Sequence, residues 1–171
     1  MKIFIAYLSQ TGNTEKIAKV IFDEASQENE VEMSKIEKVD PSSIKGYDFL
    51  FVGSPLHAAN ISGEVSEFIK KLPASSDTKL AGFITHAAPA YPQQKLDTMS
   101  QPFKDVCAEK GMEYVGCFNC QGYLADFMHE AVQKMQKVDD ETWAENVAQM
   151  TGHPNDEDKL KAKYFTRSLL G

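Results

Sequence analysis

The stretch IFIAYLSQTGNT, residues 3–14, decides the fold class of this chain. Residues 3–8 form a continuous apolar run, which is typical of a buried parallel strand. Residues 9–14 then bring together three hydroxyl side chains, two amides and one glycine, and a helix-period segment, residues 15–25, follows directly. A turn from strand to helix presents backbone N–H groups and the positive end of the helix dipole to an anion. The stretch therefore predicts a phosphate-binding loop.

This polar loop contains no cation. No lysine or arginine lies between residues 9 and 14, so backbone N–H groups, hydroxyls and amides would hold the phosphate. Such neutral donors suit a tightly bound phosphate monoester better than a triphosphate that is being cleaved. The Gly-Lys-Ser/Thr ending of a P-loop and the glycine pattern of dinucleotide-binding loops are both missing. A turn that only caps a helix is the alternative. The candidate phosphate-binding residues are Ser9, Gln10, Thr11, Gly12, Asn13 and Thr14.

Length and charge exclude several classes of function. The 171 residues are enough for one domain with a sizeable core. The formal net charge of −7 argues against nucleic acid and anionic membranes as partners, because both require a basic surface. The apolar run near the N-terminus is too short to cross a membrane and is better explained as a strand than as a signal peptide. Three cysteines without a disulfide framework fit a reducing compartment, so we expect a cytoplasmic protein.

Apolar runs alternate with helix-period segments over the first 122 residues. The expected strands are residues 3–8, 31–36, 48–53, 80–85 and 114–118. The expected helices between them are residues 15–25, residues 64–71 with Ser62 as the N-cap, and a stretch that ends near residue 110 and is closed by Gly111. This alternation predicts an α/β domain with a doubly wound parallel sheet.

The last 49 residues differ from the rest, because residues 123–171 contain no convincing strand. Helices are expected over residues 126–136, 141–150 and 157–170. We therefore predict a single domain with a core of residues 1–122 and a helical C-terminal extension. The apolar side chains of the extension would serve in packing, in a dimer interface or in a lid over the ligand; they are Phe127, Met128, Val132, Met135, Trp143 and Met150.

Three loops are expected at one edge of the sheet, because ligands of open parallel sheets bind at the carboxyl ends of the strands. They are residues 9–14, 54–60 and 86–92. The second and third carry little charge and are rich in proline, alanine and histidine, which suits a flat, uncharged heteroaromatic ring. A phosphate together with such a ring predicts a flavin mononucleotide, FMN.

The chain resembles the flavodoxin family over residues 1–122. Its first loop matches the family's Thr/Ser-x-Thr-Gly-x-Thr pattern, and its second resembles the family's Gly-Ser/Thr-Pro loop beside the flavin ring. The extension resembles a subgroup of uncharacterised family members. The resemblance implies a three-layer α/β/α sandwich with a five-stranded parallel sheet of order 2-1-3-4-5, FMN as cofactor, and electron transfer. It places these further residues against FMN: Pro55, Leu56, His57, Ala58, Thr85, His86, Ala87, Ala88 and Tyr91.

The second loop departs from the family pattern in two ways. Many flavodoxins place a tryptophan or tyrosine from this loop against the ring, whereas the candidates here are Leu56 and His57. The loop also has no glycine between Gly53 and Gly63, so a peptide flip that needs a positive φ is more costly and we expect weaker stabilisation of the one-electron-reduced flavin. Two interpretations stay open for His57, His86 and Tyr91. Each side chain contacts the flavin in the first. In the second, His57 faces solvent, His86 is a buried structural residue and Tyr91 packs on its neighbours.

Cys117 and Cys120 have the spacing of a redox or metal motif. Positions three apart in a strand point to opposite faces, so the two thiols would not converge. The chain has no second cysteine pair to complete a zinc site, since Cys107 stands alone in a helix. We read all three cysteines as small buried apolar residues and expect no metal site.

Together these observations predict an FMN-binding, flavodoxin-like electron-transfer protein. Its acidic surface would steer redox partner proteins with basic docking surfaces. An NAD(P)H-dependent FMN or quinone reductase with a small-molecule electron acceptor is the alternative, and a flavin-free regulatory or scaffolding domain is the third reading. The sequence leaves a monomer and a homodimer equally open.

Overall fold

The computed structural model describes residues 1–57, 59–88 and 93–171. Five long strands form one parallel sheet in the order β2-β1-β3-β5-β6, which confirms the predicted order of 2-1-3-4-5 for the long strands. A two-residue strand, β4, pairs antiparallel with the end of β3. The strands are β1 (Lys2–Tyr7), β2 (Glu30–Lys35), β3 (Phe49–His57), β4 (Asn60–Ile61), β5 (Lys79–His86) and β6 (Glu113–Gln121).

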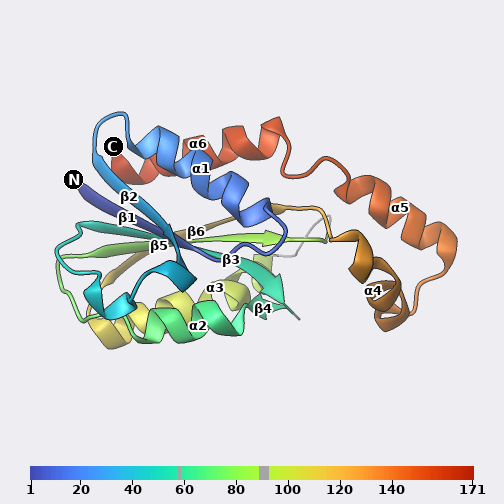
Figure 1. Cartoon of the computed structure of the whole chain (residues 1–171), viewed down its shortest axis with the longest axis horizontal. Coiled ribbons are helices and arrows are strands. Elements are labelled where there is room, and N and C mark those ends of the chain that lie inside the picture. The colour runs from blue at the N-terminus through green and yellow to red at the C-terminus, as the bar shows by residue number, and fades with distance from the viewer. Residues whose placement is uncertain (58, 89–92) are drawn as a thin grey trace.

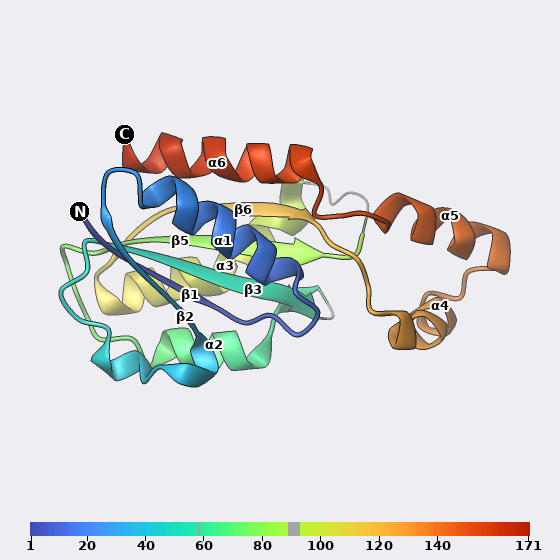
Figure 2. The same ribbon diagram turned by 45° about the horizontal axis from the view of Figure 1, so that its top comes forward.

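Helices cover both faces of this sheet, as Figures 1 and 2 show. Helices α1 (Asn13–Ala25) and α6 (Asp156–Leu170) lie over one face, and α2 (Gly63–Lys70) and α3 (Gln93–Lys110) lie over the other. Each interface contains its own buried apolar cluster. Residues of β1 belong to the two clusters alternately. Ile3 and Ile5 face α1, and Phe4 and Ala6 face α2. Burial on both faces explains why β1 is a continuous apolar run.

Three strands extend further than the sequence predicted. The predicted loop 54–60 is wrong in its first half, because β3 continues to His57. Ser54 and Pro55 still pair with β5, and the last two residues pair with β4 in a short hairpin. Strand β6 likewise runs on to Gln121, and His86 is the last residue of β5 instead of the first of a loop. These strands are longer than predicted because their last residues pair with neighbouring strands. Such pairing depends on the tertiary structure and could not be predicted from residue type.

Helix ends followed the predicted signals closely. The side chain of Ser62 accepts a hydrogen bond from the backbone of Val65 and caps α2, as predicted. Gly111, with φ of +75°, follows the last turn of α3. Asn155 and Asp158 form a reciprocal capping box at the start of α6.

Gly53 allows close packing at the centre of the sheet. A Cβ atom at Gly53 in β3 would overlap the ring of Phe83 in β5. Phe83 is fully buried against α1 and its neighbours. The absence of a side chain at residue 53 therefore lets the phenylalanine fill the core beneath the carboxyl ends of the strands.

The C-terminal extension divides into two parts. Helix α6 returns along α1 and contributes Ala162 and Phe165 to the apolar cluster there, so it belongs to the three-layer body. The preceding residues 123–150, which we call the arm, extend beyond the carboxyl ends of the strands (Figure 2). The arm consists of a 3-10 turn (Asp126–Met128), α4 (His129–Gln136) and α5 (Asp140–Met150). Among residues 1–57, 59–88 and 93–171, no helix is long and apolar enough to cross a membrane.

The cysteines of β6 lie on opposite faces of the sheet. Cys117 packs against the cluster under α3, and Cys120 belongs to the cluster under α1 and α6. Burial raises the pKa of Cys117 to about 12 and that of Cys107 in α3 to about 11. The three thiols are free and their raised pKa values keep them protonated at neutral pH. Cys107 and Cys120 are buried as predicted, whereas Cys117 is only partly buried.

Candidate functional site

The three predicted loops meet at the carboxyl edge of the sheet around a small cavity of about 100 Å³. Ten of the fifteen predicted site residues line it: Gln10, Thr11, Asn13, Thr14, Pro55, Leu56, His57, Thr85, His86 and Ala87. Ser9 and Gly12 complete the first loop, and Ala88 lines an adjoining cavity. Ala58 and Tyr91 lie outside the described residues. The cavity is also lined by Met128, one of the candidate lid residues of the extension, and by four residues that sequence reasoning missed, namely Gly122, Tyr123, Leu124 and Ala125.

The first loop has the backbone geometry that the predicted phosphate site requires. Gly12 adopts φ of +88° at the start of α1, and its carbonyl accepts the first helical bond from Lys16. The amides of Asn13 and Thr14 therefore precede the helical ladder and point out of the N-terminus, where the dipole is positive. A Cβ at Gly12 would meet no heavy atom within 4 Å, so the space in front of the loop is open.

Two hydroxyls in this loop are held as acceptors. The backbone of Glu15 donates to Ser9 Oγ at 3.2 Å, and Asn13 Nδ2 donates to Thr11 Oγ1 at 3.1 Å. A hydroxyl that accepts a bond keeps its own hydrogen for another partner. Ser9 and Thr11 can therefore donate to phosphate oxygens without losing the bonds that orient them.

The first loop is tied to the rest of the site by two further bonds. Thr14 Oγ1 and Thr85 Oγ1 are 2.8 Å apart in a buried contact, which links the loop to β5. Asn13 Nδ2 also donates to the Tyr123 carbonyl at 2.7 Å, which links the loop to the start of the arm. A Cβ at Gly122 would lie 2.8 Å from the Asn13 side chain, so this glycine makes room for the second link. The glycine at the end of β6 was the sequence signal that could have identified it.

The second loop provides an apolar wall. Pro55 and Leu56 end β3 and line the cavity together with His57, which is exposed. Ala59 in the adjoining turn has φ of +66°, a left-handed conformation that is uncommon for alanine. The loop therefore reaches a positive φ without glycine, and the folded protein bears the strain of doing so.

His86 is buried at the end of β5 and is bonded on both sides. Its Nδ1 lies 2.9 Å from the Ala88 carbonyl and its Nε2 lies 3.1 Å from Asn119 Oδ1. Burial lowers the pKa of His86, so the ring is neutral at pH 7. A neutral ring donates from one nitrogen only, and we assign that hydrogen to Nδ1, with the Asn119 amide turned so that its NH₂ group donates to Nε2.

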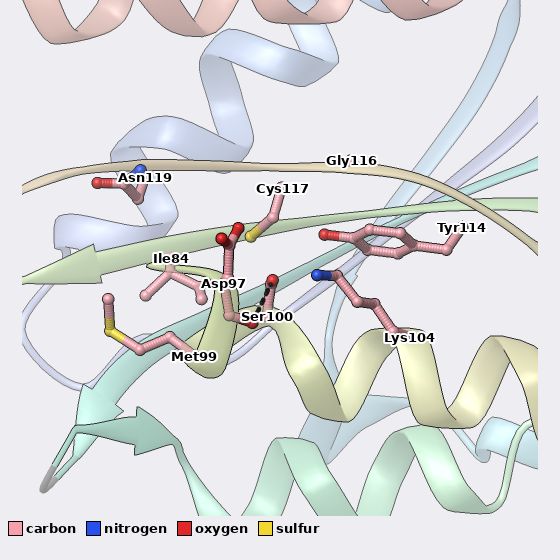
Figure 3. A pocket seen from close by; sticks show the side chains of 9 residues that line it. All are labelled: Ile84, Asp97, Met99, Ser100, Lys104, Tyr114, Gly116, Cys117 and Asn119. Carbon is pink, nitrogen blue, oxygen red and sulfur yellow. Dashed lines mark hydrogen bonds between the residues drawn. The ribbon is translucent and has the colours of Figure 1, made fainter. Parts of the chain in front are cut away.

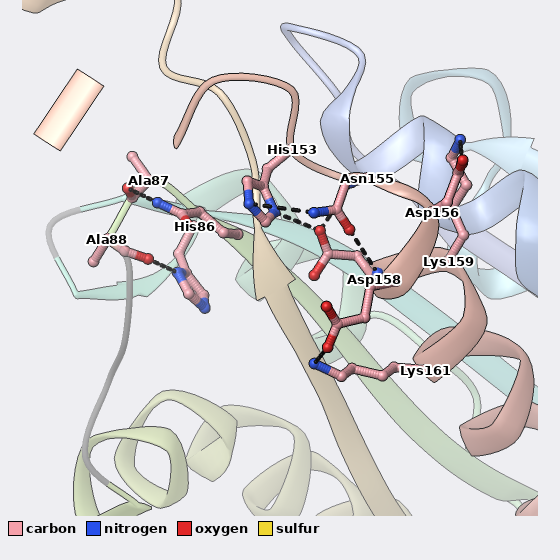
Figure 4. A network of polar contacts seen from close by, with 11 residues as sticks. His86, Ala87, Ala88, His153, Asn155, Asp156, Asp158, Lys159 and Lys161 are labelled. Atoms are coloured by element: carbon pink, nitrogen blue, oxygen red, sulfur yellow. Dashed lines mark hydrogen bonds and ion pairs between the residues drawn. The ribbon is translucent and has the colours of Figure 1, made fainter. Parts of the chain in front are cut away.

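The third loop is held through its carbonyls. Gln121 Nε2 donates to the Ala87 carbonyl at 3.1 Å, and His86 holds the carbonyl of Ala88. Figure 4 shows these contacts next to the start of α6, where His153 and Asn155 bond to Asp158. Side chains at the end of β6 thus fix the backbone that faces the cavity, which makes His86 a positioning residue in addition to a lining residue.

A larger cavity of about 500 Å³ adjoins the small one and lies between the loops and the arm. The two share the side chains of Gln10, Leu56, His57, Ala87, Leu124 and Met128. The remaining walls of the larger cavity are Ala59, Ala88, Val132, Met135, Gln136, Trp143, Asn146 and Met150. Five of the six apolar extension residues singled out above line this cavity together with the arm's amides, and Phe127 does not.

A third cavity of about 310 Å³ lies between β6 and α3, away from the loops (Figure 3). Lys104 from the helix and Tyr114 and Cys117 from the strand surround it. Burial raises the pKa of Tyr114 to about 12, so its hydroxyl stays protonated. Asn119 lines this cavity and contacts His86, which connects it to the third loop.

Comparisons with known proteins agree with this architecture. The family model of the flavodoxin domain matches residues 4–167. An uncharacterized protein of Methanocaldococcus jannaschii is 31% identical over 171 residues, covering 99% of both chains. The flavodoxin-like domain-containing protein BilS of Clostridioides difficile is 24% identical, covering 99% of this chain and 97% of that protein. The crystal structure of oxidised flavodoxin 2 from Bacillus cereus superposes with a TM-score of 0.66 at 21% identity, covering 98% and 97% of the two chains, which shows a shared fold. The chain therefore belongs to the flavodoxin family.

Proposed function

We propose that this chain is a single-domain flavodoxin that binds FMN and transfers electrons. Membership of the family supports a flavin-dependent electron-transfer or oxidoreductase role. The observation that carries the assignment to FMN is the position of a neutral phosphate cradle, residues 9–14, directly beside an uncharged cavity. When bound, FMN supplies one- and two-electron redox chemistry, and the protein supplies binding, orientation and electrostatics.

The residues present fit the two halves of FMN. The amides of Asn13 and Thr14 and the hydroxyls of Ser9 and Thr11 match a phosphate monoester. The walls made by Leu56 and the loop 85–88 match a ring without charge. Neutral His86 orients the Ala88 carbonyl and places no imidazolium charge in the cavity.

The charge of the arm supports transfer to a protein partner. Six carboxylates and two lysines in residues 123–150 leave a net charge of −4, more than half of the total of −7. Because the arm borders the cavity, these charges would attract a basic redox partner toward the flavin and steer its approach. Steering of this kind weakens as salt is added.

The second candidate is reduction of a small molecule, and the larger cavity favours it. A volume of about 500 Å³ is within the range of small-ligand sites. None of the described residues that line this cavity is lysine or arginine, so it offers no site for the pyrophosphate of NADH or NADPH. The cavity thus supports a small acceptor more strongly than a dinucleotide donor.

The assignment to FMN is tested with the Gly12→Ala variant. An alanine at φ of +88° costs about 1–2 kcal/mol and displaces the cradle, so we expect FMN affinity to fall about tenfold. Gly46→Ala is the matched control, because Gly46 has φ of +74° and open space but lies in a remote turn. Titration of the FMN-free proteins by flavin fluorescence measures both. Equal affinity in the two variants, or no binding by the parent protein, would refute the proposal.

The route of the electrons is tested by anaerobic reduction of the FMN-loaded protein. We expect reduction by a one-electron donor, and little reduction by NADH or NADPH over the same time. Rapid bleaching of the flavin absorbance by either nucleotide would instead establish the reductase.

A further inference from the structure

The cavity between β6 and α3 is separate from the two cavities at the site loops (Figure 3). None of the described residues that line it also lines either of the other two. Its volume of about 310 Å³ is at the lower end of the range of small-ligand sites. The proposed function leaves this cavity without an occupant, although its walls are rich in polar groups.

A β-bulge in β6 builds the strand side of the cavity. The register between β5 and β6 shifts at Val115, which has no partner in β5, and Gly116 follows with φ of +140°. Positions three apart in a regular strand point to opposite faces. Because of the extra residue, Tyr114 and Cys117 both pack toward α3, whereas Val115 packs on the other face of the sheet. The bulge therefore brings the Tyr114 hydroxyl and the Cys117 thiol to the same wall.

Helix α3 supplies the opposite wall and carries two opposite charges on it. Asp97, Ser100 and Lys104 recur at the i, i+3 and i+7 spacing of one helical face, and all three line the cavity. Seven residues correspond to about 10 Å along a helix. In the part of the chain that the structure describes, no carboxylate forms an ion pair with Lys104. The helical wall therefore has an anionic end and a cationic end.

Hydrogen-bond donors gather at the cationic end. Lys104 is half-buried, and its ammonium lies 5.7 Å from the centroid of the Tyr114 ring. Burial raises the pKa of Tyr114 to about 12, so its hydroxyl keeps its hydrogen at neutral pH. Figure 3 shows both side chains pointing toward the middle of the cavity. An ammonium beside a phenolic donor suits a carboxylate, because hydrogen bonds between ionised groups are stronger than neutral ones.

Acceptors gather at the anionic end. The Ser100 hydroxyl donates its hydrogen to the Asp97 carbonyl at 3.0 Å, so its oxygen can only accept from a ligand. The Asp97 carboxylate has about four acceptor sites, which leaves room for a ligand ammonium beside its contacts within the protein. A ligand with only a carboxylate would be repelled by Asp97. The occupant that fits both ends carries one positive and one negative charge.

The floor of the cavity is apolar. Ile84 from β5 and Met99 from α3 line it, and each is only 1% exposed. A ligand without an apolar part would leave these side chains in contact with water, whereas an aliphatic group would cover them. The methionine side chain adapts to groups of different shape.

We propose that the cavity between β6 and α3 binds a small zwitterion, an amino acid with an aliphatic side chain. Its carboxylate bonds to Lys104 and Tyr114, its ammonium bonds to Asp97, and its side chain packs on the apolar floor. The inference goes beyond the proposed function, and the binding does not depend on FMN.

Binding is tested with three probes that share an isobutyl group. L-Leucine carries both charges, 4-methylpentanoate lacks the ammonium, and 3-methylbutylamine lacks the carboxylate. Equilibrium dialysis of the FMN-loaded protein, repeated with the FMN-free protein, measures the three affinities. We expect saturable binding of L-leucine and affinities at least about tenfold lower for the other two, because each loses one charge-assisted contact. Absence of saturable L-leucine binding would overturn the proposal.

Two variants assign the charges to the two ends, and both keep the size of the side chain. Asp97→Asn should abolish the preference for L-leucine over 4-methylpentanoate, and Lys104→Met should abolish the preference over 3-methylbutylamine. Asp105→Asn and Lys110→Met are the matched controls, because both residues belong to α3 and lie outside the cavity. The controls should bind L-leucine as the parent protein does. Equal L-leucine affinity in each variant and its control contradicts the proposal.

Other kinds of site give different results. If the cavity is a simple anion site, 4-methylpentanoate binds as tightly as L-leucine, which overturns the proposal. If the cavity belongs to the flavin site, FMN displaces L-leucine competitively, which also overturns it. Failure of FMN to bind would refute the proposed function alone, because dialysis of the FMN-free protein still measures the amino-acid site.

Discussion

The α/β body and the arm are built on opposite principles. The body has two large apolar clusters, and the side chains of Phe49, Phe51 and Phe83 within it are inaccessible to solvent. The arm has only Trp143 and Met150 buried among its helical residues, and several of its contacts involve polar groups. His129, for example, meets the Trp143 ring edge-on at 5.6 Å and lies 3.0 Å from the Leu124 carbonyl.

The difference in packing suits the body and the arm to different roles. Hydrogen bonds join the loop 9–14 and the loop 85–88 to the buried strand β5, so we expect both loops to keep a fixed geometry. The arm is attached at its two ends and held by a small internal cluster. Its apolar residues can therefore be substituted with little loss of stability in the body. We infer that the body determines cofactor binding, and that the arm determines what approaches the cofactor.

The largest expected effect compares the core of the body with the small cluster of the arm. Phe51→Ala removes a buried ring stacked on Phe49 at 4.6 Å and should cost about 4 kcal/mol of unfolding free energy. Trp143→Ala should cost less than about 1 kcal/mol, because the arm can open without unfolding the sheet. Urea denaturation followed by circular dichroism measures both. Equal losses would show that arm and body unfold as one unit.

The next largest loss of stability is expected from overpacking the sheet. Gly53→Ala places a methyl group in the Phe83 ring, and we expect a loss of about 3 kcal/mol. Gly63→Ala at the start of α2 meets nothing within 4 Å and should be neutral or stabilising by about 0.5 kcal/mol. Thermal unfolding of the two variants provides the comparison, and similar midpoints would contradict the close packing around Phe83.

A stabilising change is expected in the second loop. Ala59→Gly relieves a positive φ and should raise the unfolding free energy by up to about 1 kcal/mol. The gain should appear without any change in the arm, since residue 59 lies in the turn after β3. A decrease in stability in urea denaturation would show that the left-handed alanine bears no strain.

The smallest effect concerns pH. The pKa of folded His86 lies below its unfolded value of about 6.5, so the unfolded chain binds its proton first as pH falls. His86 therefore lowers stability progressively below about pH 6.5 and has no such effect above it. His86→Gln cannot titrate, and its unfolding free energy should decline less between pH 7 and pH 5 than that of the parent protein. Parallel pH profiles would refute this assignment.

Much of the fold and part of the site could be predicted from local sequence. The run 3–8, the polar loop 9–14 and the cap Ser62 each act through their own neighbourhood, and the structure has them as expected. The end of β3 could not be predicted in this way, because Leu56 and His57 become strand only through pairing with β4. Asn119, Gln121 and Tyr123 were missed for the same reason, since their roles depend on partners far away in the sequence.

The sequence by itself determined the α/β class, the polar strand-to-helix loop 9–14 and the resemblance to flavodoxins, because apolar periodicity and turn chemistry are local properties. Only the tertiary structure decided the role of the extension. It placed α6 in the body against α1 and turned the apolar residues of α4 and α5 toward the site loops. An amphipathic helix shows which face seeks a partner, whereas the identity of that partner depends on where the chain brings it.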